Sequence, residues 1–188
     1  MVFGRFLSAC CMLFLTCAAT AQTALDPELR ELLRKAASET DSFEDRFDAE
    51  VWLFDMSARL ADRISDPQER ILILKTVHYE ATRAEVPPEL VLAVIDIESN
   101  FDRYAVSHAD ARGLMQVMPF WLKDIGLPGD NLFHIQTNLR LGCTILGYYM
   151  KMENSNLHRT LGRYNGSLGS RRYSDKVLEV LRNKWYRL

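Results

Sequence analysis

The stretch VLAVIDIESNF, residues 91–101, decides how the chain is interpreted, because an apolar run ends in a carboxylate. On a helix, at about 100° per residue, Glu98 falls close to the azimuth of Val91 and Ile95, while Asp96 falls on the other side. We therefore expect Glu98 to face the core from the last turn of a helix, and Asp96 to face away from the core.

The surroundings expected for Glu98 oppose its ionisation in two ways. Apolar neighbours disfavour the charged carboxylate, and the negative end of the helix dipole lies close to it. Both effects raise the pKa of Glu98, which is what a general acid needs at near-neutral pH. Periodicity alone leaves an alternative open, in which Glu98 is a helix-end residue that reaches past the rim to solvent.

Nearly every other segment has helical patterning, so the predicted fold class is all-α. The clearest helix start is at Asp66, which is expected to cap a helix with Pro67 in its first position and Glu69 at capping-box spacing. Two short helices, broken near Pro119, are expected within 111–126. The remaining helices are expected at 26–37, 43–64, 66–83, 87–99, 134–152, 158–166 and 174–186.

Residues 1–21 have the features of a signal peptide. A short start with one arginine is followed by an apolar run and by the small residues ATA at 19–21, which predict cleavage after Ala21. We therefore expect an exported, periplasmic protein. A lipoprotein-like sequence ends at Cys10, but too few apolar residues precede it for export, so lipidation is not expected. No later stretch is long and apolar enough to predict a transmembrane helix.

The rest of the chain is predicted to form an N-terminal helical extension, 22–65, and a main domain, 66–188. Residues 22–90 hold 16 acidic and 9 basic side chains, a net charge of −7, whereas 91–188 hold 9 and 13, a net charge of +4. The basic part lacks an Arg/Lys run with interleaved aromatic residues, so nucleic acid is not an expected partner. The acidic helices could dock a cell-envelope assembly partner, although packing onto the main domain is the simpler interpretation. Only Cys143 follows the signal segment, which leaves no internal disulfide.

Short motifs begin at Glu98 and follow one another along most of the remaining chain. They are E-S-x-F at 98–101, A-x-S at 105–107, G-L-M-Q-x-M-P at 113–119, N-x-x-x-G at 138–142, Y-N at 164–165 and a further tyrosine, Tyr173. Together they resemble the family 1 lytic transglycosylases, typified by the soluble lytic transglycosylases of bacteria, over about 67–180. Asp110, Ile145 and the turn at 165–169 depart from the family pattern, and because of Asp110 and that turn the sequence leaves the detailed shape of the subsites open.

The resemblance implies a lysozyme-like helical domain of the goose type that acts on peptidoglycan glycan strands. The bond cleaved would be the β-1,4 bond between N-acetylmuramic acid and N-acetylglucosamine, and the product would be a 1,6-anhydromuramoyl end. Glu98 would protonate the leaving oxygen and then accept the proton of the muramoyl C6 hydroxyl as that oxygen attacks C1. No metal and no other cofactor is needed for this chemistry.

The resemblance also assigns roles to six other residues. Tyr164 and Ser99 would support and orient Glu98, and four residues would line the cleft: Ser107, Gln116, Met118 and Asn165. Each role has a plain alternative. Serines often cap helices or close turns, Met and Tyr often fill cores, and an Asn before a Gly often ends a helix. The histidines show no paired ligand spacing, so no metal site is expected.

Two other functions compete with the transglycosylase. Ordinary glycosidases need two carboxylates, and a substrate-assisted reaction can dispense with one of them. A hydrolytic muramidase of the goose-lysozyme type would therefore need Asp102 or Asp110 to activate water, and neither lies in a recognised motif. A catalytically idle wall-binding scaffold is the other alternative. The sequence leaves open whether strands are cut internally or from an end.

Overall fold

The described part of the chain, residues 27–38, 42 and 45–186 of a computed structural model, is built from helices, with two isolated bridges and no sheet. The all-α prediction is therefore confirmed. The predicted signal peptide, 1–21, and Cys10 lie outside the described residues. The helices are α1 Pro27–Ser38, α2 Arg46–Leu60, α3 Pro67–Arg83, α4 Pro88–Glu98, α5 Trp121–Ile125, α6 Ile135–Met152, α7 Leu157–Tyr164, α8 Arg172–Val180 and a π-helical turn, η1, at Leu181–Trp185.

Helix α3 begins as its local sequence predicts. The side chain of Asp66 accepts a hydrogen bond from the backbone N–H of Gln68 at 2.9 Å, and Pro67 occupies the first turn, where no N–H donor is needed. The predicted cap is therefore confirmed.

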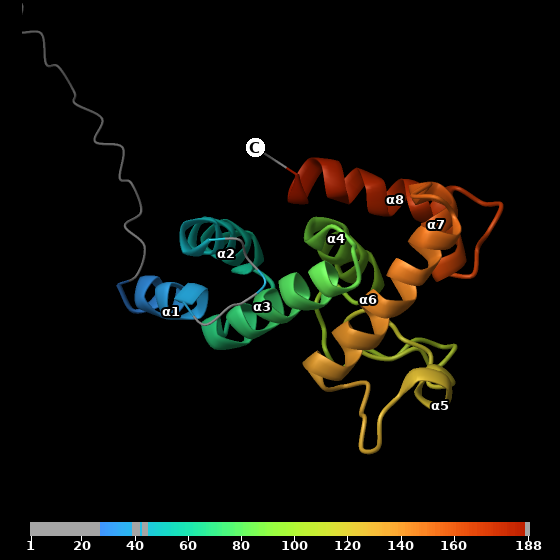
Figure 1. The fold of residues 1–188 in the computed structure, drawn as a ribbon, viewed down its shortest axis with the longest axis horizontal. Coiled ribbons are helices and arrows are strands. Elements are labelled where there is room, and N and C mark those ends of the chain that lie inside the picture. Colours follow the sequence, from blue (N-terminus) through green and yellow to red (C-terminus); the bar gives the residue numbers. More distant parts are fainter. Residues whose placement is uncertain (1–26, 39–41, 43–44, 187–188) are drawn as a thin grey trace, which may run out of the picture.

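α3 lies at the centre of the molecule (Figure 1). α1 and α2 pack on one end of it, and α4 and α6 pack on the other. α8 and η1 cover α4, and α7 packs between α6 and α8. α4, which carries Glu98, is consequently enclosed by helices from both halves of the chain.

This central position makes α4 buried around most of its circumference. Every residue from Leu90 to Ile95 is at most 1% exposed. The expectation that Asp96 faces away from the core is therefore wrong. Its side chain is only 7% exposed and forms ion pairs with Arg63, which follows α2, and with Lys184 of η1, a turn that packs on α4.

The segment 111–126 differs from the sequence-based expectation of two short helices, since α5, Trp121–Ile125, is the one helix that the structure describes there. Residues Arg112 and Val117 exchange both backbone hydrogen bonds at 3.0 Å and so close a tight turn. Gly113 and Gln116 inside this turn have positive φ angles of 74° and 49°. A right-handed helix cannot include such residues.

Several contacts join the predicted N-terminal extension to the rest of the molecule. The indole N–H of Trp52 donates to Glu89 at 2.8 Å, and Arg59 donates to the backbone carbonyl of Lys184. The boundary between 22–65 and 66–188 remains a prediction. In the described part of the chain, no helix combines the length and the apolar character that crossing a membrane would take.

Candidate active site

Glu98 is the last residue of α4, and its half-buried side chain meets a tyrosine from the far end of the chain. The hydroxyl of Tyr173, in the first turn of α8, donates to Oε1 of Glu98 at 2.6 Å. The chain reverses directly after Glu98, since Asn100 and Phe101 have positive φ angles of 50° and 67°. Phe101 is 5% exposed, so this reversal is anchored in the core.

The surroundings of Glu98 hold its pKa above that of a free glutamate. Burial is the largest cause, because a buried carboxyl group lacks the water that would stabilise its charged form. Hydrogen bonds from Tyr173 and Asn165 act in the opposite direction, since they stabilise the charged form, but they only partly offset burial. Burial and the nearby Glu98 charge raise the pKa of Tyr173, which therefore keeps its proton and remains a donor.

Tyr164 was expected to hydrogen-bond near Glu98 and to orient it, and that role remains a prediction. The Tyr164 hydroxyl donates to the backbone carbonyl of Met115 at 2.8 Å, and the tyrosine bonded to Glu98 is Tyr173. The reason is positional, because Tyr164 ends α7 opposite the 113–116 turn whereas Tyr173 begins α8 beside the end of α4. Tyr173 belongs to the motif set, but nothing in its local sequence marks it as the partner of Glu98.

The turn at 113–116 is fastened to three helices. Ser99, at the end of α4, donates through Oγ to the carbonyl of Leu114 at 2.8 Å. Tyr164 holds the next carbonyl from α7. Asn138 of α6 is 1% exposed and accepts from the Met115 N–H at 2.8 Å. Ser99 and Tyr164 thus hold the turn that lies against the Glu98 end of α4.

Two glycines allow this close packing. Gly113 has a φ angle of +74°, and a Cβ there would lie 2.3 Å from Nδ2 of Asn138. A Cβ on Gly142 would lie 2.4 Å from the sulfur of Met115, so α6 can approach the turn only because the side chain is absent.

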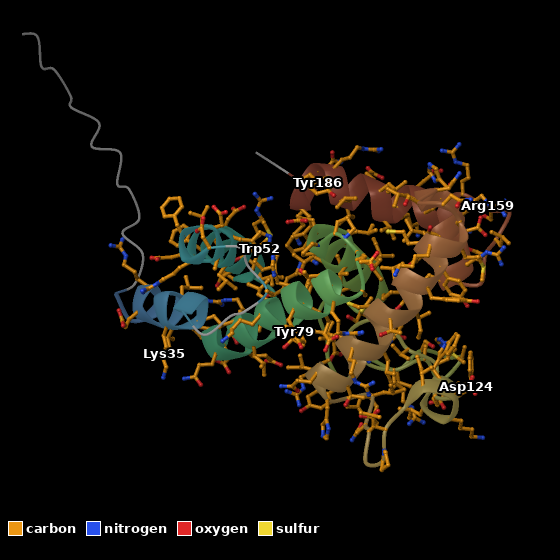
Figure 2. The ribbon with its side chains drawn as sticks, in the orientation of Figure 1. Lys35, Trp52, Tyr79, Asp124, Arg159 and Tyr186 are labelled. Carbon is orange, nitrogen blue, oxygen red and sulfur yellow. The ribbon has the colours of Figure 1, made fainter. Side chains whose placement is uncertain are left out.

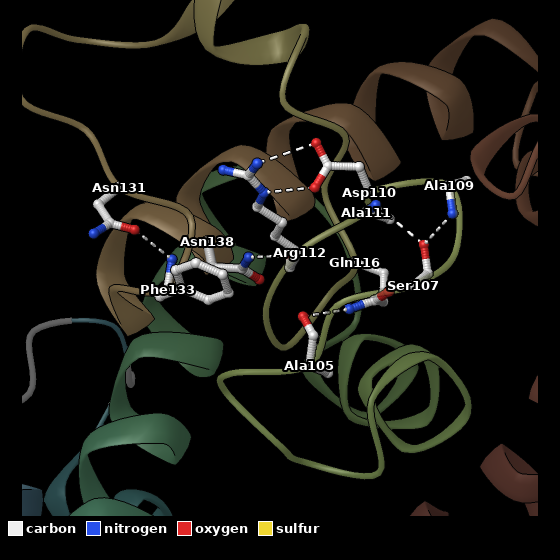
Figure 3. A network of polar contacts seen from close by, with 10 residues as sticks. All are labelled: Ala105, Ser107, Ala109, Asp110, Ala111, Arg112, Gln116, Asn131, Phe133 and Asn138. Carbon is white, nitrogen blue, oxygen red and sulfur yellow. Dashed lines mark hydrogen bonds and ion pairs between the residues drawn. The ribbon is translucent and has the colours of Figure 1, made fainter.

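Figure 3 shows the contacts of Ser107 and Gln116. Ser107 Oγ accepts from the backbone N–H groups of Ala109 and Ala111 at 3.2 and 3.1 Å, and so closes a local turn. The side-chain nitrogen of Gln116 donates to the carbonyls of Ala105 and Gly113 at 3.1 and 3.0 Å. That arrangement commits the amide nitrogen to the protein, and only the amide oxygen could then bind a ligand donor.

The other two predicted cleft residues lie on different elements. Met118 is half-buried directly after the turn, and Asn165 is an exposed residue that follows α7 and also contacts Glu98. The sequence allowed Asn165 to be no more than a helix-ending residue. The structure places it beside the carboxylate of Glu98.

The two aspartates considered as bases for a hydrolase are occupied by local contacts. Asp102 accepts from the backbone N–H of Tyr104 at 2.8 Å. Asp110 forms two hydrogen bonds with Arg112 at 3.0 and 3.1 Å, and its φ angle of 66° lies in the left-handed region that favours glycine. The described residues contain no group of three His, Cys, Asp or Glu side chains that could hold a metal ion.

Comparison with known proteins decides the family. The sequence profile of the Transglycosylase SLT domain matches residues 75–184, which is more than half of the chain. The chain belongs to this family. The matched part of the SLT domain runs from within α3 to η1 and includes Glu98, the 113–116 turn and Tyr173. The resemblance found in the sequence is thereby confirmed.

Named relatives of this SLT domain share part of their length with it. The membrane-bound lytic murein transglycosylase C of Salmonella arizonae is 39% identical over 114 residues, which cover 52% of this chain and 30% of the relative. The protein of that name from Klebsiella pneumoniae (strain 342) is 35% identical over 113 residues, which cover 52% and 31%. The aligned region thus spans about a third of the length of the curated relatives.

One solved structure also resembles the chain. It is an inactive mutant of the lytic transglycosylase Slt of Pseudomonas aeruginosa, with 21% identity and a TM-score of 0.47, and the match covers 83% of this chain and 34% of that one.

Proposed function

We propose that this protein is an exported lytic transglycosylase of peptidoglycan, with Glu98 as its single acid and base. The observation that carries the proposal is the surroundings of Glu98, a half-buried carboxylate with a raised pKa that is held at 2.6 Å by a neutral hydroxyl. The family match and the names of the relatives support the substrate class.

The raised pKa suits the first chemical step. A protonated Glu98 donates its proton to the glycosidic oxygen that leaves, which lowers the barrier to breaking the β-1,4 bond between N-acetylmuramic acid and N-acetylglucosamine. The N-acetyl group of the substrate stabilises the positive charge that develops at C1, as in substrate-assisted glycosidases.

The second step uses the same carboxylate as a base. The ionised Glu98 accepts the proton of the muramoyl C6 hydroxyl while that oxygen bonds to C1, which closes the 1,6-anhydro ring and restores the protonated acid. No water is consumed, so no second carboxylate is required. The local contacts of Asp102 and Asp110 support this outcome over hydrolysis, since both side chains already have partners.

Tyr173 has the geometry of a positioning residue for both steps. Its hydroxyl donates to one oxygen of Glu98 at 2.6 Å and would hold the carboxylate in position. Asn165 adds a second hydrogen bond to the carboxylate. Ser99 and Tyr164 would act indirectly by holding the 113–116 turn, and Ser107, Gln116 and Met118 would line the cleft on the turn side.

The experiment that tests this function is digestion of purified peptidoglycan sacculi, with released fragments identified by mass spectrometry. Anhydromuramoyl products, lighter by one water molecule than hydrolysed ones, are expected from the wild type and not from Glu98→Gln. Products with reducing ends would instead identify a muramidase. A folded wild type that binds sacculi and releases nothing would identify a wall-binding scaffold.

A further inference from the structure

Helix α2 carries apolar side chains on two sides. One side is packed into the core through Ala49, Leu53, Met56 and Leu60. The other side exposes Phe47, Val51 and Phe54 to solvent at 73%, 53% and 44%. These three residues, the α2 stripe, follow one another at intervals of four and three and therefore lie on one line along the helix.

Two hollows border the α2 stripe, and Val51 lines both. One, of about 550 Å³, lies between α2, Glu89 at the start of α4, and Trp185 and Tyr186 at the C-terminal end. The second, also of about 550 Å³, is lined by the stripe and by Arg30 of α1. Figure 2 labels Trp52, which lines the first hollow from α2, and Tyr186 across from it.

The charges around the α2 stripe are mostly negative. Among the described residues, the two hollows are lined by the carboxylates of Asp48, Glu50, Asp55 and Glu89 and by one cation, that of Arg30. Arg59 offsets part of this charge, since it pairs with Asp55 at 2.6 Å. The excess of acid extends beyond the stripe, because residues 22–90 have a net charge of −7.

We propose that the α2 stripe is the docking site of a basic amphipathic helix from another protein. A helix that is apolar on two sides is ordinarily buried on both, and here the described residues cover only one. The three residues of the α2 stripe span two helical turns. Apolar residues with this spacing are typical of helices that pack against a partner through one face. The acidic surroundings select a partner with lysines or arginines beside those residues.

The contacts of α2 give such docking a consequence. Trp52 joins α2 to Glu89 at the start of α4, and Arg63, just after α2, pairs with Asp96 two residues before Glu98. A partner bound to α2 is therefore held at a fixed position relative to the catalytic helix. This inference goes beyond the proposed chemistry and does not depend on it.

The test uses two synthetic helical peptides of about 18 residues, or five turns, with the same leucine pattern and either lysine or glutamate at every polar position. Binding of each labelled peptide to protein purified from expression of the whole chain is measured by fluorescence anisotropy. The lysine peptide is expected to bind. The triple variant Phe47→Ser, Val51→Ser, Phe54→Ser is expected to bind it at least about tenfold more weakly, a loss of roughly 1.4 kcal/mol.

A matched variant controls for general loss of apolar surface. Leu72→Ser, Tyr79→Ser and Tyr148→Ser also remove three exposed apolar side chains, from α3 and α6, and should leave peptide binding unchanged. Both triple variants should keep the helical circular dichroism and the sacculus digestion of the wild type, since no changed residue contacts Glu98. Digestion therefore reports on the proposed function separately from docking.

Five results would overturn the proposal. The wild type could fail to bind the lysine peptide at about 1 mM, or bind the glutamate peptide equally well. The stripe variant could bind like the wild type. A dimer in sedimentation that dissociates in the stripe variant would assign the stripe to a second copy of the chain. Binding that appears only after removal of residues 1–26 would assign it to the chain's own N-terminal segment.

Discussion

Two carboxylates on α4, two residues apart, have opposite surroundings. Asp96 lies between two cations, Arg63 and Lys184, and is nearly inaccessible to solvent. Glu98 is held by the neutral hydroxyl of Tyr173, and among the described residues no Lys, Arg or His forms an ion pair with it. The same helix thus carries one carboxylate that is paired with cations and one whose charge only neutral donors stabilise.

The difference shows how a fold can give two carboxylates of one helix different electrostatic surroundings. A buried charge is costly unless a counter-charge accompanies it, and cations beside Asp96 supply that compensation. Neutral donors compensate Glu98 only in part, so its pKa stays raised and a proton remains available. Both residues belong to one short helix, so the difference between Asp96 and Glu98 comes from the side chains that the facing helices place beside each of them.

The largest expected effect is on catalysis, where the two carboxylates should behave differently. Glu98→Gln removes the proton donor and should lower the rate of sacculus digestion about 10²- to 10⁴-fold. Asp96→Asn, assayed well below its unfolding temperature, should retain most of the wild-type rate. An Asp96→Asn protein that is folded and as inactive as Glu98→Gln would break the comparison.

For stability the order of the two carboxylates should be reversed, so that replacing Asp96 has the larger effect. Asp96→Ala leaves Arg63 and Lys184 without their shared partner and should lower the free energy of unfolding by about 2–3 kcal/mol. This loss is smaller than the roughly 3–5 kcal/mol expected for a fully buried pair, because both cations are partly exposed. Urea denaturation followed by circular dichroism measures this loss. Asp55→Ala, which breaks the more exposed pair with Arg59, is the control and should cost at most about 1 kcal/mol.

The hydroxyl of Tyr173 can be removed without touching the carboxylate. Tyr173→Phe deletes a hydrogen bond that favours ionised Glu98, so the pKa of Glu98 should rise further and the alkaline limb of the activity profile should move to higher pH. The maximal rate should fall about tenfold through loss of positioning, the equivalent of roughly 1.4 kcal/mol. Tyr164→Phe, which removes the bond to Met115, should leave that limb in place; an equal shift in both variants would refute the assignment to Tyr173.

The smallest expected effect is a dependence of stability on pH. Because the pKa of Glu98 is higher in the folded than in the unfolded protein, the folded state binds more protons between the two values. The wild type should therefore lose stability as pH rises through that window, and Glu98→Gln should not. Thermal unfolding should show Glu98→Gln as the more stable protein at pH 8 and nearly equal to the wild type near pH 3. Equal differences at both values would contradict a raised pKa.

The sequence by itself determined the features that depend on neighbouring residues. The cap formed by Asp66 and Pro67, the helix that ends at Glu98 and the inward direction of that carboxylate all follow from local hydrogen bonding and helical periodicity. The order of the motifs was also sufficient to predict the family that the profile match confirms. The tight turn after residue 111 was missed, because its left-handed residues, Gly113 and Gln116, interrupt a pattern that otherwise suits a helix.

Only the tertiary structure decided which residues surround each carboxylate. The bond from Tyr173 to Glu98 joins residues 75 apart in the sequence, and the bond from Lys184 to Asp96 joins residues 88 apart. Neither Tyr173 nor Lys184 has a local feature that marks its partner, since a side chain's contacts over such separations depend on how α4, α8 and η1 pack together. Periodicity could place Glu98 toward the core, but the pKa of its carboxyl depends on those packed neighbours.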